Sequence, residues 1–239
     1  MGAMSAAFII GVSKTGIPGI GILAVTVLAM SMPAKLSVGV MLPMLIVGDI
    51  FAVIYWHRKA QWKYLWRVAP PAAIGVVIGY FLMGAVGDAL LRRLIGGIAI
   101  VLLTLQLLRE RGFLTNERVP HHWLFAWMLG GLAGVVSMMC NAAGPIMIVF
   151  FLAMRLDRFQ FIGTIAWYFM LLNLFKVPFF VSLGLISTRS LAFNLKLAPV
   201  IVLGAALGIF APRWIPEKSF RYVIMTLAAA AGVKLLAFG

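Results

Sequence analysis

A few polar and charged side chains lie inside long apolar runs of this sequence, where such groups are costly in a membrane and mark functional sites. The first is Lys14, flanked by Ser13, Thr15 and Gly16. An interrupted helix there would expose backbone N–H groups at the start of its second half, and such an end binds anions. A lysine beside it indicates an anion-binding site. The simpler interpretation is a lysine that reaches the membrane surface or pairs with Asp49.

Further candidates lie in three other apolar runs. Asn141 offers amide donors, with Gly144 behind it, although asparagine also suits a turn that ends a helix. Asn173 and Lys176 share one helix face at i, i+3. Asp49 could carry a coupling proton, or form a purely structural ion pair with either lysine.

The composition places these residues in a membrane protein. The chain has 239 residues, of which 64% are hydrophobic and 11% charged, whereas soluble domains are about 45–50% apolar and about 25% charged. The net charge of +14 comes from basic residues at the ends of apolar runs, as at Arg58, Lys59, Lys63 and Arg67. That position is typical of residues that set membrane topology, and it argues against nucleic-acid binding.

The apolar runs predict an all-α polytopic membrane protein. Each is long enough to cross a bilayer as a helix, and they cover residues 3–32, 36–56, 67–87, 91–108, 124–153, 159–184, 191–211 and 218–237. A more polar stretch divides the chain near its middle. The predicted organisation is a first transmembrane repeat over 1–109, a connecting loop over 110–122 and a second repeat over 123–239.

The two halves resemble one another in sequence, which is typical of transporters. The matches keep their order with offsets of 123 to 129 residues, and they pair Gly11 with Gly134, Gly21 with Gly144, Asp49 with Asn173, Gly75 with Gly204, and Gly79 with Gly208. The duplicated GxxxG permits close helix contact. We expect it to pack inside the bundle, and a homodimer interface is the alternative.

Each half opens with a segment of about 30 residues, longer than one crossing needs, that is broken by Gly, Pro and polar residues. Either one interrupted crossing or a re-entrant hairpin of two short helices would fit. Lys and Arg separate clearly between the two sides only if both segments are re-entrant. The sequence therefore predicts two hairpins, six crossings and inverted repeats.

Enzyme chemistry finds little support in the sequence. His57, His121 and His122 have no acidic companions at metal-ligand spacing, and no nucleophile elbow, P-loop or dinucleotide fingerprint occurs. We therefore expect no metal, no cofactor and no catalytic residues. A passive channel, an intramembrane enzyme and a structural subunit are the alternatives to a transporter.

Several motifs also resemble one known family. Residues 11–25 (GVSKTGIPGIGILAV), 49–53 with 55–62, 141–145 (NAAGP) and 161–169 running on to 173–178 (NLFKVP) are similar in order and spacing to the sulfite exporter TauE/SafE family of anion permeases. The resemblance implies a multi-pass protein of the bacterial inner membrane that moves sulfite or an organosulfonate. Together with the residues above, it predicts a secondary transporter whose anion is held by Ser13, Lys14, Thr15, Gly16, Asn141, Gly144, Asn173 and Lys176.

Overall fold

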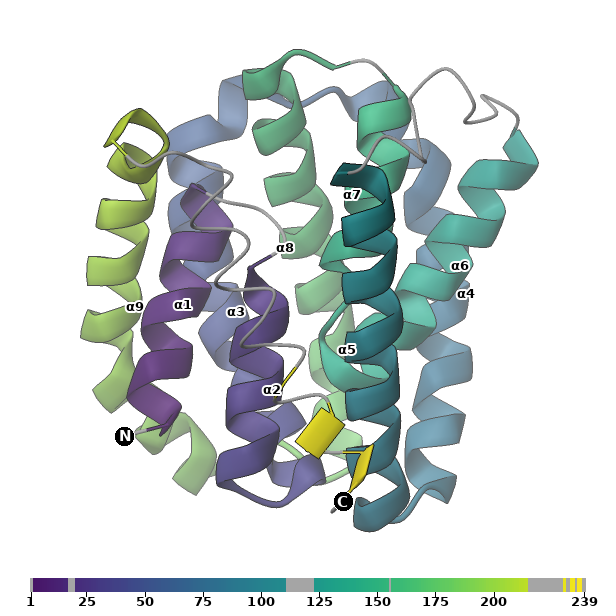
Figure 1. Ribbon diagram of the computed structural model, residues 1–239, viewed down its shortest axis with the longest axis vertical. Helices are drawn as coiled ribbons and strands as arrows, with labels where there is room; N and C mark the ends of the chain where they lie inside the picture. Colours follow the sequence, from purple (N-terminus) through teal and green to yellow (C-terminus); the bar gives the residue numbers. More distant parts are fainter. Residues whose placement is uncertain are drawn as a thin grey trace.

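The chain folds as a bundle of helices that lie side by side (Figure 1). The computed structural model describes residues 2–16, 20–110, 123–154 and 156–214, with residues 230, 233–234 and 236–237. In chain order the elements are α1 (Gly2–Thr15), α2 (Gly21–Ser31), α3 (Ala34–Trp56), the short 3-10 helix η1 (His57–Lys59), α4 (Trp62–Ala85), α5 (Asp88–Glu110), α6 (Trp123–Cys140), α7 (Gly144–Ala153), α8 (Arg158–Ser182) and α9 (Thr188–Trp214).

This architecture confirms the predicted all-α polytopic membrane fold. Five helices of the described part are long and apolar enough to cross a membrane: Ala34–Lys59, Trp62–Ala85, Trp123–Cys140, Phe159–Ser182 and Thr188–Phe210. α5 has 23 residues and carries Arg92 and Arg93 near its start. The predicted segment 218–237 and the connecting loop fall almost wholly outside the described residues.

The opening segment of each half folds back on itself as a helical hairpin. Gly2 at the start of α1 lies against Ser31 at the end of α2, and Gly21 lies against Ser13 near the break. α1 has 14 residues, about 21 Å of helix, so it cannot cross a hydrocarbon core of about 30 Å alone. The structure thus favours a hairpin over a single interrupted crossing, and its depth in a bilayer stays a prediction.

The second hairpin consists of α6 and α7. The rings of Phe125, early in α6, and Phe150, late in α7, stack with centroids 6.3 Å apart. The two helices therefore run in opposite directions from the break between them.

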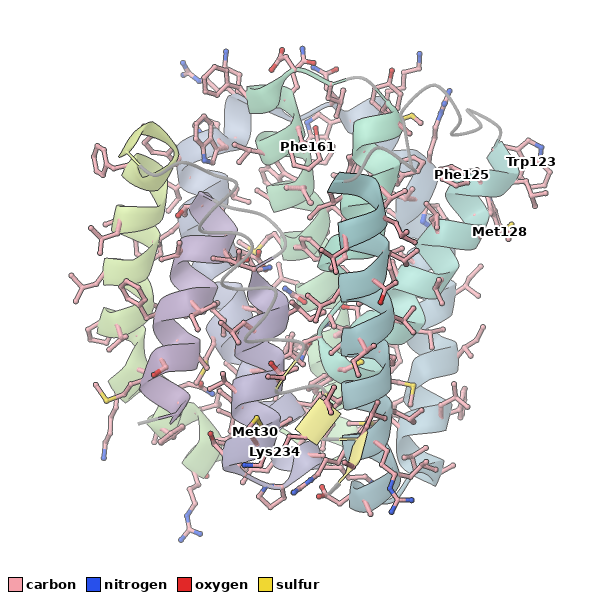
Figure 2. All side chains as sticks on the ribbon, in the orientation of Figure 1. Met30, Trp123, Phe125, Met128, Phe161 and Lys234 are labelled. Atoms are coloured by element: carbon pink, nitrogen blue, oxygen red, sulfur yellow. The ribbon has the colours of Figure 1, made fainter. Side chains whose placement is uncertain are left out.

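The two hairpins open toward opposite ends of the bundle. The first leads into α3 and the second into α8, and these two helices are antiparallel. The ring of Trp56, at the end of α3, stacks on Phe159, at the start of α8, with centroids 5.4 Å apart. Met30, from the first hairpin, consequently lies at one end of the molecule, and Trp123, from the second, lies near the other (Figure 2).

Glycines bring the two halves into backbone contact at matching positions. Gly134 of α6 lies against Ala72 and Gly75 of α4, and Gly11 of α1 lies against Ile201 and Gly204 of α9. A Cβ on any of these glycines would overlap backbone atoms of the facing helix. The GxxxG pairs therefore pack inside the bundle, as predicted, and each joins one half of the chain to the other.

Candidate functional site

A small cavity lies where the two helix breaks meet α3 and α8, and its volume is about 60 Å³. The hairpins contribute the ends that face one another, and the long helices contribute one wall each. Its polar lining consists of Ser13, Lys14, Asp49, Ser137, Asn141 and Asn173, with Gly21 and Gly144 at the helix starts. Ile22, Met41, Leu45, Ile148, Ile165 and Phe169 supply apolar lining.

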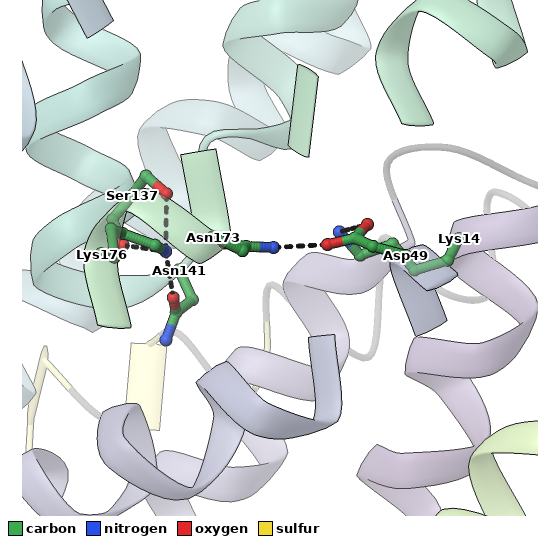
Figure 3. Close-up of polar contacts among 6 residues, drawn as sticks. All are labelled: Lys14, Asp49, Ser137, Asn141, Asn173 and Lys176. Atoms are coloured by element: carbon green, nitrogen blue, oxygen red, sulfur yellow. Dashed lines mark hydrogen bonds and ion pairs between the residues drawn. The ribbon is translucent and has the colours of Figure 1, made fainter. Parts of the chain in front are cut away.

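A chain of charged and polar contacts crosses this cavity (Figure 3). Lys14 Nζ lies 2.6 Å from Asp49 Oδ1, and Asn173 Nδ2 donates to Asp49 Oδ2 at 2.6 Å. Asp49 is fully buried, whereas the Lys14 side chain keeps 12% of its surface exposed. Asp49 therefore pairs with Lys14, as one interpretation of the sequence expected, and the lysine still borders the cavity.

Phe169 adds an aromatic wall to the lysine. The Lys14 ammonium lies 4.4 Å from the centroid of the Phe169 ring, within the range of a cation–π contact. Phe169 and Asn173 are one turn apart on α8 and both line the cavity. The ring and the Asp49 carboxylate together hold the ammonium at the cavity wall.

The second lysine lies behind the cavity. Lys176 is fully buried, and its Nζ donates to Ser137 O at 3.1 Å, Ser137 Oγ at 2.9 Å and Asn141 Oδ1 at 2.7 Å. Three oxygen acceptors match the three N–H donors of an ammonium. Lys176 thus holds the Asn141 side chain rather than bordering the cavity itself.

Asn141 forms the turn that ends α6. It has a φ of 55°, a left-handed conformation that asparagine tolerates better than most residues. Its Nδ2 donates to Val38 O of α3 at 3.0 Å. Both ends of the amide are therefore engaged, and the second break is fixed to α3 on one side and to α8 on the other.

Two helices start at the cavity, because Gly21 begins α2 and Gly144 begins α7, and both glycines line it. Ile20, which precedes α2, makes no side-chain capping hydrogen bond. The partial positive charge of a helix start favours an anion there. No atom of the described residues lies within 4 Å of the position that a Cβ of Gly144 would occupy, so the glycine leaves room among them at the start of α7.

Besides Lys176, two predicted site residues do not line the cavity. Thr15 is buried, and its hydroxyl donates to Gly11 O at 3.2 Å and to Ala205 O at 2.7 Å. Gly16 lies against Gly208 of α9. Both residues contact α9 instead of the cavity, and their role in holding the substrate stays a prediction.

The prediction also missed three residues that the site uses, Gly21, Ser137 and Phe169. Ser137 follows Lys14 by 123 residues, the offset that relates the two hairpins, so the repeat itself pointed to it. Phe169 precedes Asn173 by four residues, on the same helix face. Its place one turn before Asn173 was therefore a signal for the cavity face, whereas its contact with Lys14 depends on tertiary packing.

A comparison with protein-family models decides the family. The model described as sulfite exporter TauE/SafE matches residues 3–235, nearly the whole chain. The chain belongs to the sulfite exporter TauE/SafE family. Searches of curated proteins and of solved structures gave no match.

Membership of the TauE/SafE family confirms the resemblance read from the motifs. The family consists of membrane transporters that export sulfur-containing anions, not of enzymes. The family match and the membrane-spanning helices together make this chain a multi-pass membrane transport protein.

Proposed function

We propose that this protein is a secondary active transporter for a small sulfur-containing anion, such as sulfite or an organosulfonate, in the bacterial inner membrane. The observation that carries the proposal is the cavity between the two breaks. It joins a lysine to two helix starts inside a bundle whose family transports sulfur anions.

The charges of the site favour an anion. Two lysines and one aspartate lie in or directly behind the cavity, so their formal charges leave an excess of one positive charge. Asp49 is already bound by Lys14 and Asn173. An incoming anion would add the negative charge that this arrangement lacks, at the helix starts and beside Lys14.

The size of the cavity favours a compact anion. Pockets for drug-sized ligands have volumes of about 300–1,000 Å³, whereas this one has about 60 Å³. A water molecule needs at least about 10–15 Å³ of such space, so an oxyanion of a few heavy atoms is the appropriate scale. Larger sulfonates would require the hairpins to move apart.

Alternating access follows from two oppositely oriented repeats. The antiparallel α3 and α8, the hairpins that open to opposite ends and the matching glycine contacts support inverted repeats. Rocking one hairpin away from the cavity would open one side, and rocking the other would open the opposite side. In this scheme Asp49 either orients Lys14 or carries a coupling proton that frees the lysine for the substrate.

The test is the flux of labelled sulfite and of a short alkylsulfonate into proteoliposomes, with protein-free vesicles as the control. We expect saturable uptake that is accelerated by unlabelled substrate on the opposite side. Uptake without such acceleration would instead indicate a passive anion channel. A proton gradient applied in each direction measures whether protons are coupled. If neither sulfur anion is taken up but a small carboxylate is, the substrate is a carboxylate and not a sulfur-containing anion.

A further inference from the structure

A second and larger cavity lies on the outside of the bundle, between α4 and α8. Its volume is about 320 Å³, within the range of pockets that hold organic ligands. It is lined on the α4 side by Leu65, Trp66, Ala69, Pro70 and Ala73, and on the α8 side by Tyr168, Leu171, Leu172 and Phe175. Small residues opposite large aromatic ones leave the space unfilled, and its lining is almost entirely apolar.

Two basic residues lie at one end of this groove. Lys63 precedes Pro70 by seven residues, so it lies at the Pro70 edge of the groove, near the start of α4. Lys63 Nζ and Arg67 Cζ flank the ring of Tyr64, at 5.9 Å and 5.7 Å from its centroid. Both side chains are exposed. Neither residue lines the groove, and both lie beside its Trp66 end, near the start of α4.

Neither basic residue is neutralised within the described part of the chain. The salt bridges found there join Lys14 to Asp49 and Arg92 to Asp88. Asp157, at the same end of the bundle, accepts hydrogen bonds from Phe159 N and Gln160 N and so caps α8. The preceding turn adds two more exposed cations, Arg58 and Lys59. Among the described residues, the cations at this end outnumber Asp157, so the end carries an excess of positive charge.

We infer that the groove binds a phospholipid with a net negative headgroup. One acyl chain lies between α4 and α8, and the headgroup phosphate lies against Lys63 and Arg67. The apolar length suits hydrocarbon, and basic residues at the membrane end of such a groove select anionic headgroups. Trp66, which is 64% exposed, lies between the apolar groove and the basic residues, and tryptophan is favoured at such a membrane–water interface.

The test measures which lipids remain bound to the purified protein. The protein is equilibrated with equal amounts of phosphatidylglycerol and phosphatidylcholine of identical acyl chains, and retained lipid is counted by native mass spectrometry. We expect selective retention of phosphatidylglycerol, reduced roughly tenfold in Lys63→Gln/Arg67→Gln. Arg189→Gln/Lys196→Gln removes two exposed charges from α9 and should leave the ratio unchanged.

A second variant separates the acyl groove from the charges. Ala73→Leu places bulk in the groove while keeping Lys63 and Arg67, and it should lower retention of both lipids. Equal retention of the two headgroups by the wild type would overturn the inference, as would an unchanged ratio in Lys63→Gln/Arg67→Gln. A dimer that Ala73→Leu dissociates, with no lipid retained, would show that a second copy occupies the groove instead.

Discussion

Asn173 donates a hydrogen bond of 2.6 Å to Asp49, and these residues occupy matching positions in the two halves of the chain. The carboxylate of one half is thus bound by the amide of the other. Lys14 binds the remaining carboxylate oxygen. The contact joins α3 to α8 at the cavity, so it links the two halves of the chain there.

This contact predicts that Asn173→Asp is more harmful than Asn173→Ala. The alanine variant removes one hydrogen bond to a charged group, worth about 1.5–3 kcal/mol. The aspartate variant places two carboxylates in contact. Ionising both of them there costs more free energy than the loss of that one hydrogen bond. Unfolding measurements in detergent at neutral pH would show which of the two variants is less stable. An aspartate variant as stable as the alanine variant would contradict the arrangement.

The ion pair predicts strong coupling between Lys14 and Asp49. Lys14→Met leaves a buried carboxylate without its cation, which costs about 3–5 kcal/mol. Lys14→Met/Asp49→Asn removes both charges and should recover most of that loss. A cycle of unfolding measurements on the single and double variants tests this. If the double variant is no more stable than Lys14→Met, the two residues are not paired in solution.

A larger side chain at Gly144 should fill the cavity without disturbing the fold. Its Cβ position is open among the described residues and it lines the cavity, so Gly144→Leu should abolish flux while unfolding like the wild type. Gly87 also has open space at its Cβ position and lies in the exposed link between α4 and α5. Gly87→Leu should therefore transport normally. Normal flux through Gly144→Leu would show that the substrate does not pass through the cavity.

The glycine contacts between α4 and α6 predict a large difference between two substitutions in one helix. Gly75→Ala would push a Cβ into the backbone of Gly131, whereas the nearest atom to a Cβ on Gly84 is Leu183 Cδ2 at 3.9 Å. Gly75→Ala should lower the free energy of unfolding by about 1–3 kcal/mol, and Gly84→Ala should leave it unchanged or raise it slightly. Similar unfolding temperatures for the two would argue against this close packing.

Much of the fold could be predicted because apolar length and repeated motifs are local signals. The GxxxG matches indicated helix contacts, and the distribution of Lys and Arg indicated that the broken segments are hairpins. The side on which each polar residue points was harder to predict. Lys14 and Thr15 are neighbours in sequence, yet helix rotation places Lys14 at the cavity and Thr15 against α9.

The partners of the buried lysines also depend on tertiary packing. Asp49 was equally available to either lysine in sequence terms, and α1 places Lys14 beside it. Lys176 instead reaches Ser137 and Asn141, 39 and 35 residues earlier in the chain. Such distances between partners cannot be read from spacing within one helix.

The most direct test of the account compares sulfite flux through the wild type and through Lys14→Met/Asp49→Asn in proteoliposomes. The double variant removes the cation from the cavity without leaving an unpaired carboxylate, so it should fold. The account predicts a loss of flux of about ten- to a hundredfold, the effect expected for one charge-assisted contact. Wild-type flux through a correctly folded double variant would contradict the claim that the anion binds beside Lys14.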